Sequence, residues 1–158
     1  MFEKVLVPLD GSKVGEAALP VIERMVDQMA PGTRVEVTLL GVITLLRHWV
    51  VVGEASAPVS YTEEELKVIQ DRVMGYLTRT GEVLKTKGVS VNVMVRTGNA
   101  ADEILKAAEE IKAHLIAMST HGRSGLRRLA FGSITDKVLR GSKIPVLMVR
   151  AAEGTVNE

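Results

Sequence analysis

The sequence predicts an α/β protein built on a doubly wound, open, parallel five-stranded sheet in the order 3-2-1-4-5, with helices on both faces. Short apolar runs of strand length alternate along the chain with longer segments of helical period, and this alternation favours a parallel sheet. The first, fourth and fifth runs are continuously apolar, as expected of strands covered on both faces, whereas the third alternates and suits an edge. Right-handed crossovers restrict the topology to the doubly wound arrangement.

The individual elements follow from these periods and from their end signals. Strands are expected at 5–7, 35–43, 89–96, 114–118 and 144–149. Helices are expected from Ser12 to Pro31-Gly32, from Thr62 to Gly88, from Gly98-Asn99 to Ile111, and over 134–140. Polar residues at helix starts predict N-caps at Ser12, at Thr62 with Glu65 in a capping box, at Asn99, and at Ser133 with Asp136.

Residues 1–150 are expected to form a single domain, followed by a frayed tail at 151–158. Residues 44–61 make a long connection within it, and connections of more than about 12–15 residues are usually functional or disordered. Its apolar residues, including Leu45, Leu46 and Trp49, leave two alternatives. The segment is either a flap or partner surface, or an extra helix or hairpin packed on the domain.

Composition narrows the functional classes. The chain has 46% apolar and 25% charged residues, as in an ordinary globular protein, and a net charge of +1 that indicates no nucleic-acid partner. It has no cysteine, which excludes disulfides and thiolate metal sites. We recognise no signal peptide and no apolar stretch of the roughly 18–20 residues that span a bilayer. A cytoplasmic protein without membrane association is expected.

The segment from Ser119 to Ser133 carries the strongest functional signal. It lies between an apolar strand and a helix and contains Gly122, Gly125 and Gly132, with His121 and Arg123 among them. A glycine-bearing loop lets backbone N–H groups approach a phosphate chain, and the positive end of the following helix dipole favours the negative charge. The alternative is that these glycines are turn residues only. The pattern predicts a phosphate-binding loop.

Asp10 ends the first strand and faces this loop in the predicted order, because strands one and four are neighbours where the winding reverses. Ligands bind at such a point, beyond the carboxyl ends of the strands. Asp10 is either a turn residue before a helix capped by Ser12, or a carboxylate that bonds a ribose or holds a metal through water. Nothing beside His121 supplies a nucleophile or an orienting carboxylate. The familiar hydrolase, dehydrogenase and Walker signatures are absent from the sequence.

Together these residues resemble the ATP-binding branch of the universal stress protein family over nearly the whole chain. The start, Lys4 to Ser12, is similar to the family's first strand and turn, and 115–149 resembles its C-terminal third. Gly122, nine residues and Gly132-Ser133 match the second half of the pattern G-x2-G-x9-G-[ST]. Ser119 stands at the first glycine. Because serine keeps the backbone N–H and adds little bulk, we expect it to weaken the site rather than abolish it.

The resemblance implies a Rossmann-like fold of the adenine nucleotide alpha hydrolase type and an ATP-binding, usually homodimeric stress-response protein. ATP would carry Mg²⁺ or Mn²⁺ on its phosphates, with Asp10 at the ribose or indirectly at the metal and Val42 presenting backbone to the adenine. The implied binding residues are Pro8, Leu9, Asp10, Val42, Met118, Ser119, His121, Gly122, Arg123, Gly125, Gly132, Ser133 and Ile134. An apolar edge strand left bare is an aggregation risk, so a dimer through 144–149 is expected.

Three functions remain open at this point. The first is a nucleotide-dependent signalling or stress-response protein, which the lack of a general base or nucleophile favours. The second is a slow ATPase that uses the same site. The third is a dimeric scaffold that does not bind nucleotide, which Ser119 alone supports.

Overall fold

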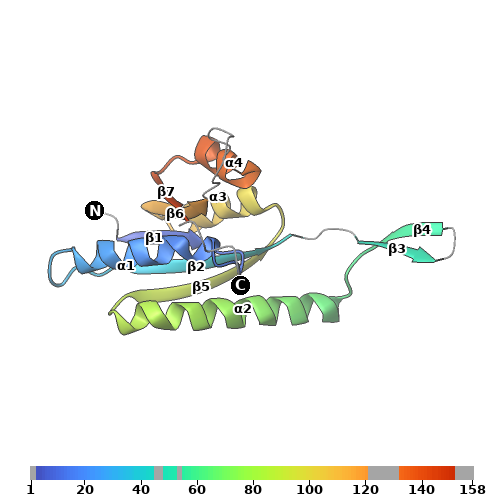
Figure 1. Cartoon of the computed structure of the whole chain (residues 1–158), viewed down its shortest axis with the longest axis horizontal. Coiled ribbons are helices and arrows are strands. Elements are labelled where there is room, and N and C mark those ends of the chain that lie inside the picture. Colours follow the sequence, from blue (N-terminus) through green and yellow to red (C-terminus); the bar gives the residue numbers. More distant parts are fainter. Residues whose placement is uncertain (1–2, 45–47, 53–54, 121–131, 152–158) are drawn as a thin grey trace.

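A five-stranded parallel sheet organises the chain, in a computed structural model that describes residues 3–44, 48–52, 55–120 and 132–151 (Figure 1). The strand order is β5-β2-β1-β6-β7, and every neighbouring pair is parallel. The strands are β1 (Lys4–Pro8), β2 (Glu36–Ile43), β5 (Ser90–Thr97), β6 (Leu115–Thr120) and β7 (Val146–Arg150). In order of the chain this is 3-2-1-4-5, so the predicted fold class and topology are confirmed.

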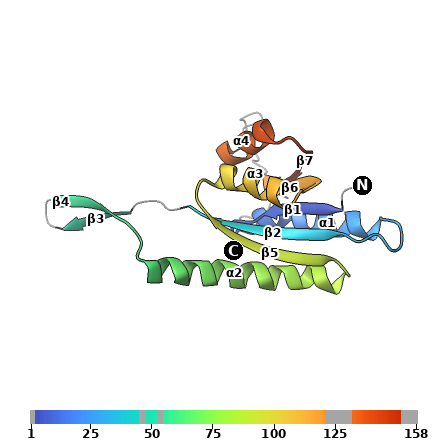
Figure 2. The same cartoon turned by 180° about the vertical axis from the view of Figure 1, so that it is seen from behind.

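Helices cover both faces of the sheet (Figures 1 and 2). A 3-10 turn, η1 (Gly15–Ala18), leads into α1 (Leu19–Asp27), and the other helices are α2 (Glu63–Thr86), α3 (Ala100–Glu110) and α4 (Ser133–Gly141). One core lies beneath η1, α1 and α2, and contains Ala18, Ile22 and Leu77. The other lies beneath α3 and α4, and contains Ile104 and Val138. The chain therefore winds to one face before β5 and to the other after it.

Strand periodicity decides which side chain enters which core. In β6, Leu115 and Ala117 belong to the core under α1 and α2, whereas Ile116 and Met118 belong to the core under α3 and α4. Successive strand residues point to opposite faces. The next residue on the α1 side is Ser119, so the position of this side chain follows from the apolar pattern before it.

The two edge strands differ from the central ones in burial. β5 exposes Ser90 and Asn92, which confirms the predicted half-solvated edge. β7 was expected to be covered on both faces, and this is wrong for the single chain, because its first four residues are only partly buried and Arg150 is exposed. Its place at the sheet edge leaves it one neighbouring strand, β6.

Two of the four predicted helix caps are found. Thr62 and Glu65 form the capping box of α2, and the Asn99 side chain accepts the Asp102 N–H at the start of α3. Ser12 is not the N-cap: its Oγ accepts the Gly15 N–H at 2.9 Å, but the N-cap of the helical turn that follows is Val14. Ser133 is not a cap, because the N-cap of α4 is Gly132 and Ser133 is the first helical residue. The predicted cap is one residue too late, and the N-cap residue Gly132 has no side chain to cap the helix.

The long connection between β2 and α2 contains a hairpin of β3 (His48–Val52) and β4 (Ala55–Val59). The two strands pair antiparallel as a separate sheet, and the hairpin extends away from the main sheet (Figure 1). It is therefore not packed on the domain as the hairpin alternative assumed.

The end of the chain departs from a simple tail. Ala151 is 3% exposed, and its N–H donates to the Thr120 carbonyl at 3.0 Å. The rest of the expected tail, 152–158, lies outside the described residues.

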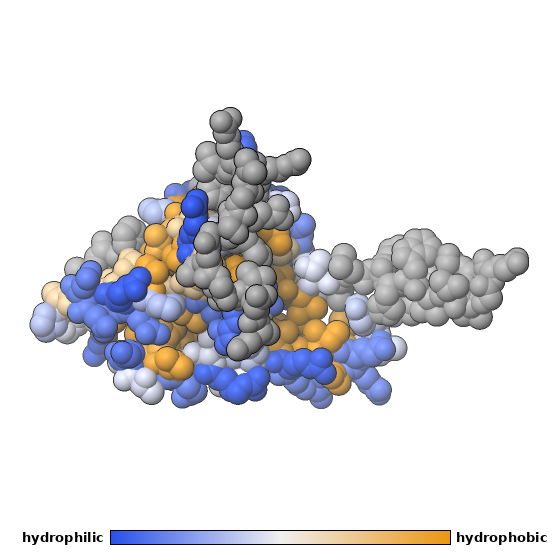
Figure 3. All heavy atoms as spheres, in the orientation of Figure 1, coloured by the Kyte–Doolittle hydropathy of each residue, from blue (hydrophilic) through white to orange (hydrophobic). Residues whose placement is uncertain are grey.

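On the face shown in Figure 3, hydrophilic side chains predominate along the lower edge, where α2 lies. In the described part of the chain, no helix is long and apolar enough to cross a membrane.

Candidate functional site

The carboxyl ends of β1 and β6 meet where the winding of the sheet reverses. Val5 pairs with Leu115 and Leu6 with Ile116, so the two strands are parallel neighbours and their carboxyl ends lie at the same edge of the sheet. The Leu9 N–H donates to the Leu40 carbonyl of β2 at 2.8 Å, which fixes the chain as it leaves β1. The residues after β1 and β6 thus emerge at one edge of the sheet, as the sequence predicts.

Asp10 forms a tight turn at this edge. Its Oδ1 accepts the Ser12 N–H at 2.9 Å and the Ser12 hydroxyl at 2.6 Å. Gly11 between them has φ +82°, a conformation that glycine adopts without steric cost. None of the described residues donates a hydrogen bond to Asp10 Oδ2, and the side chain is exposed. The turn role of Asp10 is therefore real, and it leaves one carboxylate oxygen open to a ligand.

Gly15 completes this turn, and sequence reasoning missed it. A Cβ added at Gly15 would lie 2.5 Å from Asp10 Oδ1 and 3.3 Å from Ser12 Oγ. A separation of 2.5 Å is well below van der Waals contact, so any other residue here would displace the Asp10 carboxylate. The available signal was a glycine in the first turn of an expected helix, where helix propensity disfavours it.

Ser119 has a structural partner on the same side. Its hydroxyl accepts the Ala18 N–H at 2.9 Å and donates to the Gly15 carbonyl at 2.8 Å. The side chain is partly buried. The serine that departs from the glycine pattern therefore ties the end of β6 to η1 by two hydrogen bonds.

A third connection to η1 comes from α2 and was also missed. The Tyr76 hydroxyl donates to Glu16 Oε1 at 3.0 Å. Burial, followed by this hydrogen bond and the Glu16 charge, raises the pKa of Tyr76 above its ordinary value, and the Asp10 charge adds to the rise. The influence of Asp10 sets Tyr76 in the electrostatic neighbourhood of the turn. No sequence signal links positions 60 residues apart, so only the fold reveals this contact.

The amino end of α4 has the features of an anion-binding terminus. The first N–H groups of a helix have no partner within the helix, and none of the described side chains caps them here. At Gly132 no atom of the described residues lies within 4 Å of an added Cβ. Ser133 is exposed and Ile134 is 45% exposed. These residues fit a phosphate group approaching along the helix axis.

The remaining predicted residues fall into two groups. Pro8 and Val42 are partly buried, and Met118 is 7% exposed; the Val42 and Met118 side chains pack in the core under α3 and α4. Their side chains are thus committed to packing. His121, Gly122, Arg123 and Gly125 lie outside the described residues.

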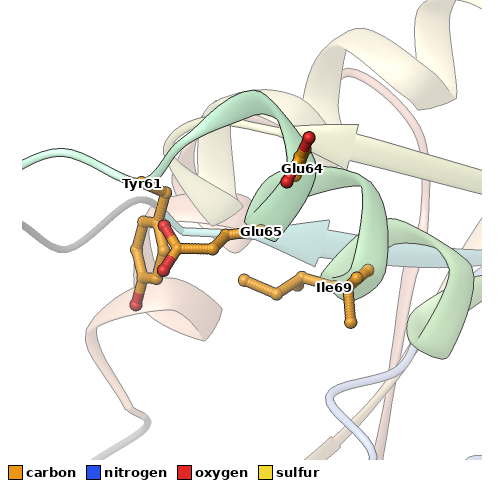
Figure 4. Close-up of a pocket in the computed structure, with 5 residues that line it drawn as sticks. Tyr61, Glu64, Glu65 and Ile69 are labelled. Carbon is orange, nitrogen blue, oxygen red and sulfur yellow. The ribbon is translucent and has the colours of Figure 1, made fainter.

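A separate depression of about 400 Å³ lies at the amino end of α2 (Figure 4). Its lining is Tyr61, Glu64, Glu65, Val68 and Ile69. None of the predicted site residues that the structure describes belongs to it. In the whole described part of the chain there is also no group of three or more histidine or acidic side chains placed to hold a metal ion.

The fold and this edge define the chain as a doubly wound α/β protein of the class that binds ligands beyond the carboxyl ends of its strands. The profile of the universal stress protein family matches residues 1–150. The chain therefore belongs to the universal stress protein family.

Individual relatives agree with this assignment. Universal stress protein YxiE of Bacillus subtilis is 30% identical over 151 residues, covering 95% of this chain and 100% of that protein. Universal stress protein MJ0577 of Methanocaldococcus jannaschii is 28% identical over 159 residues, covering 95% of this chain and 96% of that protein. Its solved structure matches with a TM-score of 0.71 over 98% of this chain and 99% of that one. A universal stress protein family structure from Arabidopsis thaliana with AMP bound shares the fold at a TM-score of 0.65 and 15% identity, covering 98% of this chain and 95% of that one.

Proposed function

We propose that this universal stress protein binds ATP at the edge where β1 and β6 end, and that it acts as a nucleotide-dependent stress-response or signalling protein. The observation that carries the proposal is the convergence at this edge of the Asp10 turn and the end of β6. The chain runs from β6 to α4, whose amino end is not capped by any described side chain. An adenine nucleotide needs both a polar partner for its ribose and a cradle for its phosphates. Bound AMP in the Arabidopsis relative adds support from the family.

The phosphates would lie against Gly132, Ser133 and Ile134, with His121, Gly122, Arg123 and Gly125 contributed by the preceding loop. Uncapped backbone N–H groups and the helix dipole favour that negative charge. Asp10 would meet the ribose through its open oxygen, beside Pro8, Leu9 and the backbone of Val42, Met118 and Ser119. A divalent ion, Mg²⁺ or Mn²⁺, would be bound by the phosphates, because such hard cations prefer oxygen ligands. Asp10 would contact this ion through water.

We favour binding over turnover because the carboxylates of the described edge already serve hydrogen bonds within the protein. Asp10 is held by Ser12, and Glu16 is engaged by Tyr76 and Lys13. The slow-ATPase alternative predicts steady-state phosphate release by the wild type above that of a Gly132→Val variant. Gly132 has room for a side chain in the folded protein, so this variant removes the phosphate approach without a packing conflict.

We further propose a homodimer through 144–149. β7 is a sheet edge whose Val146, Leu147, Met148 and Val149 are only partly buried in one chain, and bare apolar edges favour pairing with another copy. The partners proposed are thus a second chain and an adenine nucleotide, with neither nucleic acid nor membrane.

The nucleotide proposal is tested first on the wild-type protein. Purified protein is denatured and the released small molecules are identified by mass spectrometry, and melting is followed with and without Mg-ATP. We expect released adenine nucleotide or an ATP-dependent rise in melting temperature, because a ligand that binds only the folded state stabilises it. The absence of both would reject ATP binding and favour the scaffold.

Ser133→Glu tests the phosphate position against simple misfolding. A carboxylate in the first turn of α4 suits the helix dipole and stabilises it by roughly 0.3–1 kcal/mol. The same charge repels the phosphates, so we expect a higher melting temperature together with a loss of ATP binding. Calorimetric titration of this variant and of Ser133→Ala, which removes the hydroxyl without adding charge, separates the two effects. Unchanged ATP affinity in Ser133→Glu would exclude this helix end as the phosphate site.

A further inference from the structure

The 3-10 turn η1 is the point where three parts of the candidate site are joined. Ser119 at the end of β6 bonds both Gly15 and Ala18. Those are the first and last residues of η1, and their carbonyl and N–H are the two groups that an i to i+3 hydrogen bond joins in a 3-10 helix. One hydroxyl therefore holds both ends of the turn.

The other two attachments fix η1 from different directions. The Asp10 turn packs against Gly15 so closely that no Cβ fits between them, and Tyr76 of α2 bonds Glu16 at 3.0 Å. With η1 held on these sides, the Ser119 hydroxyl is what connects the strand bearing the proposed phosphate loop to the Asp10 turn. The backbone pairing of β1 with β6 joins Val5 to Leu115 and Leu6 to Ile116, which lie toward the start of both strands and not at the edge where the strands end.

We propose that Ser119 is a positioning residue that holds the start of the phosphate loop in register with Asp10, so that ribose and phosphates are met at the correct separation. This inference rests on the proposed ATP binding at the same edge. A glycine at this position supplies the same backbone but no hydroxyl. Restoring the family's glycine pattern by Ser119→Gly therefore weakens ATP binding, which is the reverse of what the pattern alone predicts.

The test measures Mg-ATP affinity by calorimetric titration for the wild type and for Ser119→Gly, Ser119→Ala and Ser119→Thr. Glycine and alanine variants bind about two- to tenfold more weakly, the range that corresponds to one net hydrogen bond, while threonine keeps the hydroxyl and restores most of the affinity. Hydrogen exchange at the amides of 15–18 is measured in parallel, and is faster in the glycine and alanine variants.

A matched control removes a serine of the same chemistry far from the nucleotide edge. Ser142 Oγ donates to the Ile144 carbonyl at 2.7 Å and accepts the Ile144 N–H at 3.2 Å. Ser142→Ala lowers the melting temperature by an amount comparable to Ser119→Ala, about 2–4 °C for a loss of this size in a chain of this length, and leaves ATP affinity unchanged. A role in stability alone would give the same affinity result for both variants.

The outcomes separate this inference from the proposed function. Unchanged or tighter ATP binding in Ser119→Gly, in a wild type that binds ATP, overturns the positioning role while leaving ATP binding intact. A wild type that binds no ATP refutes the proposed function and with it the role in binding. The exchange data still decide the link itself: faster exchange at 15–18 supports it, and unchanged exchange overturns it.

Discussion

Gly15 is the residue whose replacement most directly displaces Asp10. In Gly15→Ala the new methyl group would lie 2.5 Å from Asp10 Oδ1, so the carboxylate must move. We expect ATP affinity to fall by about tenfold or more, since a displaced ribose contact loses a charge-assisted hydrogen bond of roughly 1.5–3 kcal/mol. Calorimetric titration gives the affinity, and chemical denaturation gives the free energy of unfolding.

Gly75→Ala is the control for this change. Gly75 lies within α2, where an added Cβ meets only the end of the flexible Arg79 side chain at 3.3 Å. Alanine is a better helix former than glycine by about 1 kcal/mol, so this variant is expected to gain stability and keep its affinity. If Gly15→Ala bound ATP as tightly as Gly75→Ala, Asp10 would have no part in the site.

For single residues, the sequence predicts those whose residue type and position in a motif already indicate a role. Asp10 ends an apolar strand, and Ser119 interrupts a glycine pattern, so both can be singled out in advance. Gly15 and Tyr76 cannot, because their importance is a distance to a residue that only folding brings near. The Ser133 cap was misplaced by one position for a related reason: Gly132 needs no side chain to begin a helix.

Between elements, the Tyr76–Glu16 contact joins α2 to η1 and gives a pH-dependent stability. Burial and Glu16 raise the pKa of Tyr76 in the folded state, whereas the unfolded chain keeps an ordinary tyrosine pKa near 10. The folded state therefore holds this proton more tightly. Its stabilising contribution is complete below about pH 10 and is lost as the pH rises from there toward the folded-state pKa.

Tyr76→Phe tests this linkage. The chain has two tyrosines, so we expect the variant to lose the part of the phenolate absorbance that appears at the highest pH. Below pH 10 it should be less stable than the wild type by about 1.5–3 kcal/mol, the net value of a hydrogen bond to a charged group, and the difference should narrow above pH 10. A difference independent of pH would contradict the raised pKa.

The helices and strands differ in how well their positions could be predicted from the sequence. The N-cap residues Thr62 and Asn99 mark where α2 and α3 begin, and the sequence places both helix starts correctly. The hairpin of β3 and β4 was only one of several alternatives. Pro58 lies in β4 opposite Trp49, and a proline within an apolar run argues against a strand unless that strand lies at an edge. Its structure depends on local pairing that the periodicity does not reveal.

Over the whole molecule, the sheet topology was predictable because few arrangements satisfy both right-handed crossovers and the pattern of continuous and alternating apolar runs in the sequence. For the candidate site, the sequence predicted only the sheet edge at which it lies. The reversal of the winding indicates where a ligand binds, but it does not indicate which contacts hold that ligand. β7 is a strand whose burial the sequence predicted wrongly. Its apolar sequence suggests full coverage, yet the single chain leaves it partly exposed, and the homodimer proposed above would cover it.

The dimer prediction follows from that exposure. Val149 of β7 and Val95 of β5 are both partly buried valines packed against the same core, one on each edge strand. We expect the wild type to have twice the 17.1 kDa mass of one chain by light scattering at micromolar concentration. Val149→Glu should give a monomer, because it places a charge in the proposed interface, whereas Val95→Glu should remain dimeric. Since both variants bury the same carboxylate at similar cost, a monomer from each would show that lost stability, and not the β7 edge, controls assembly.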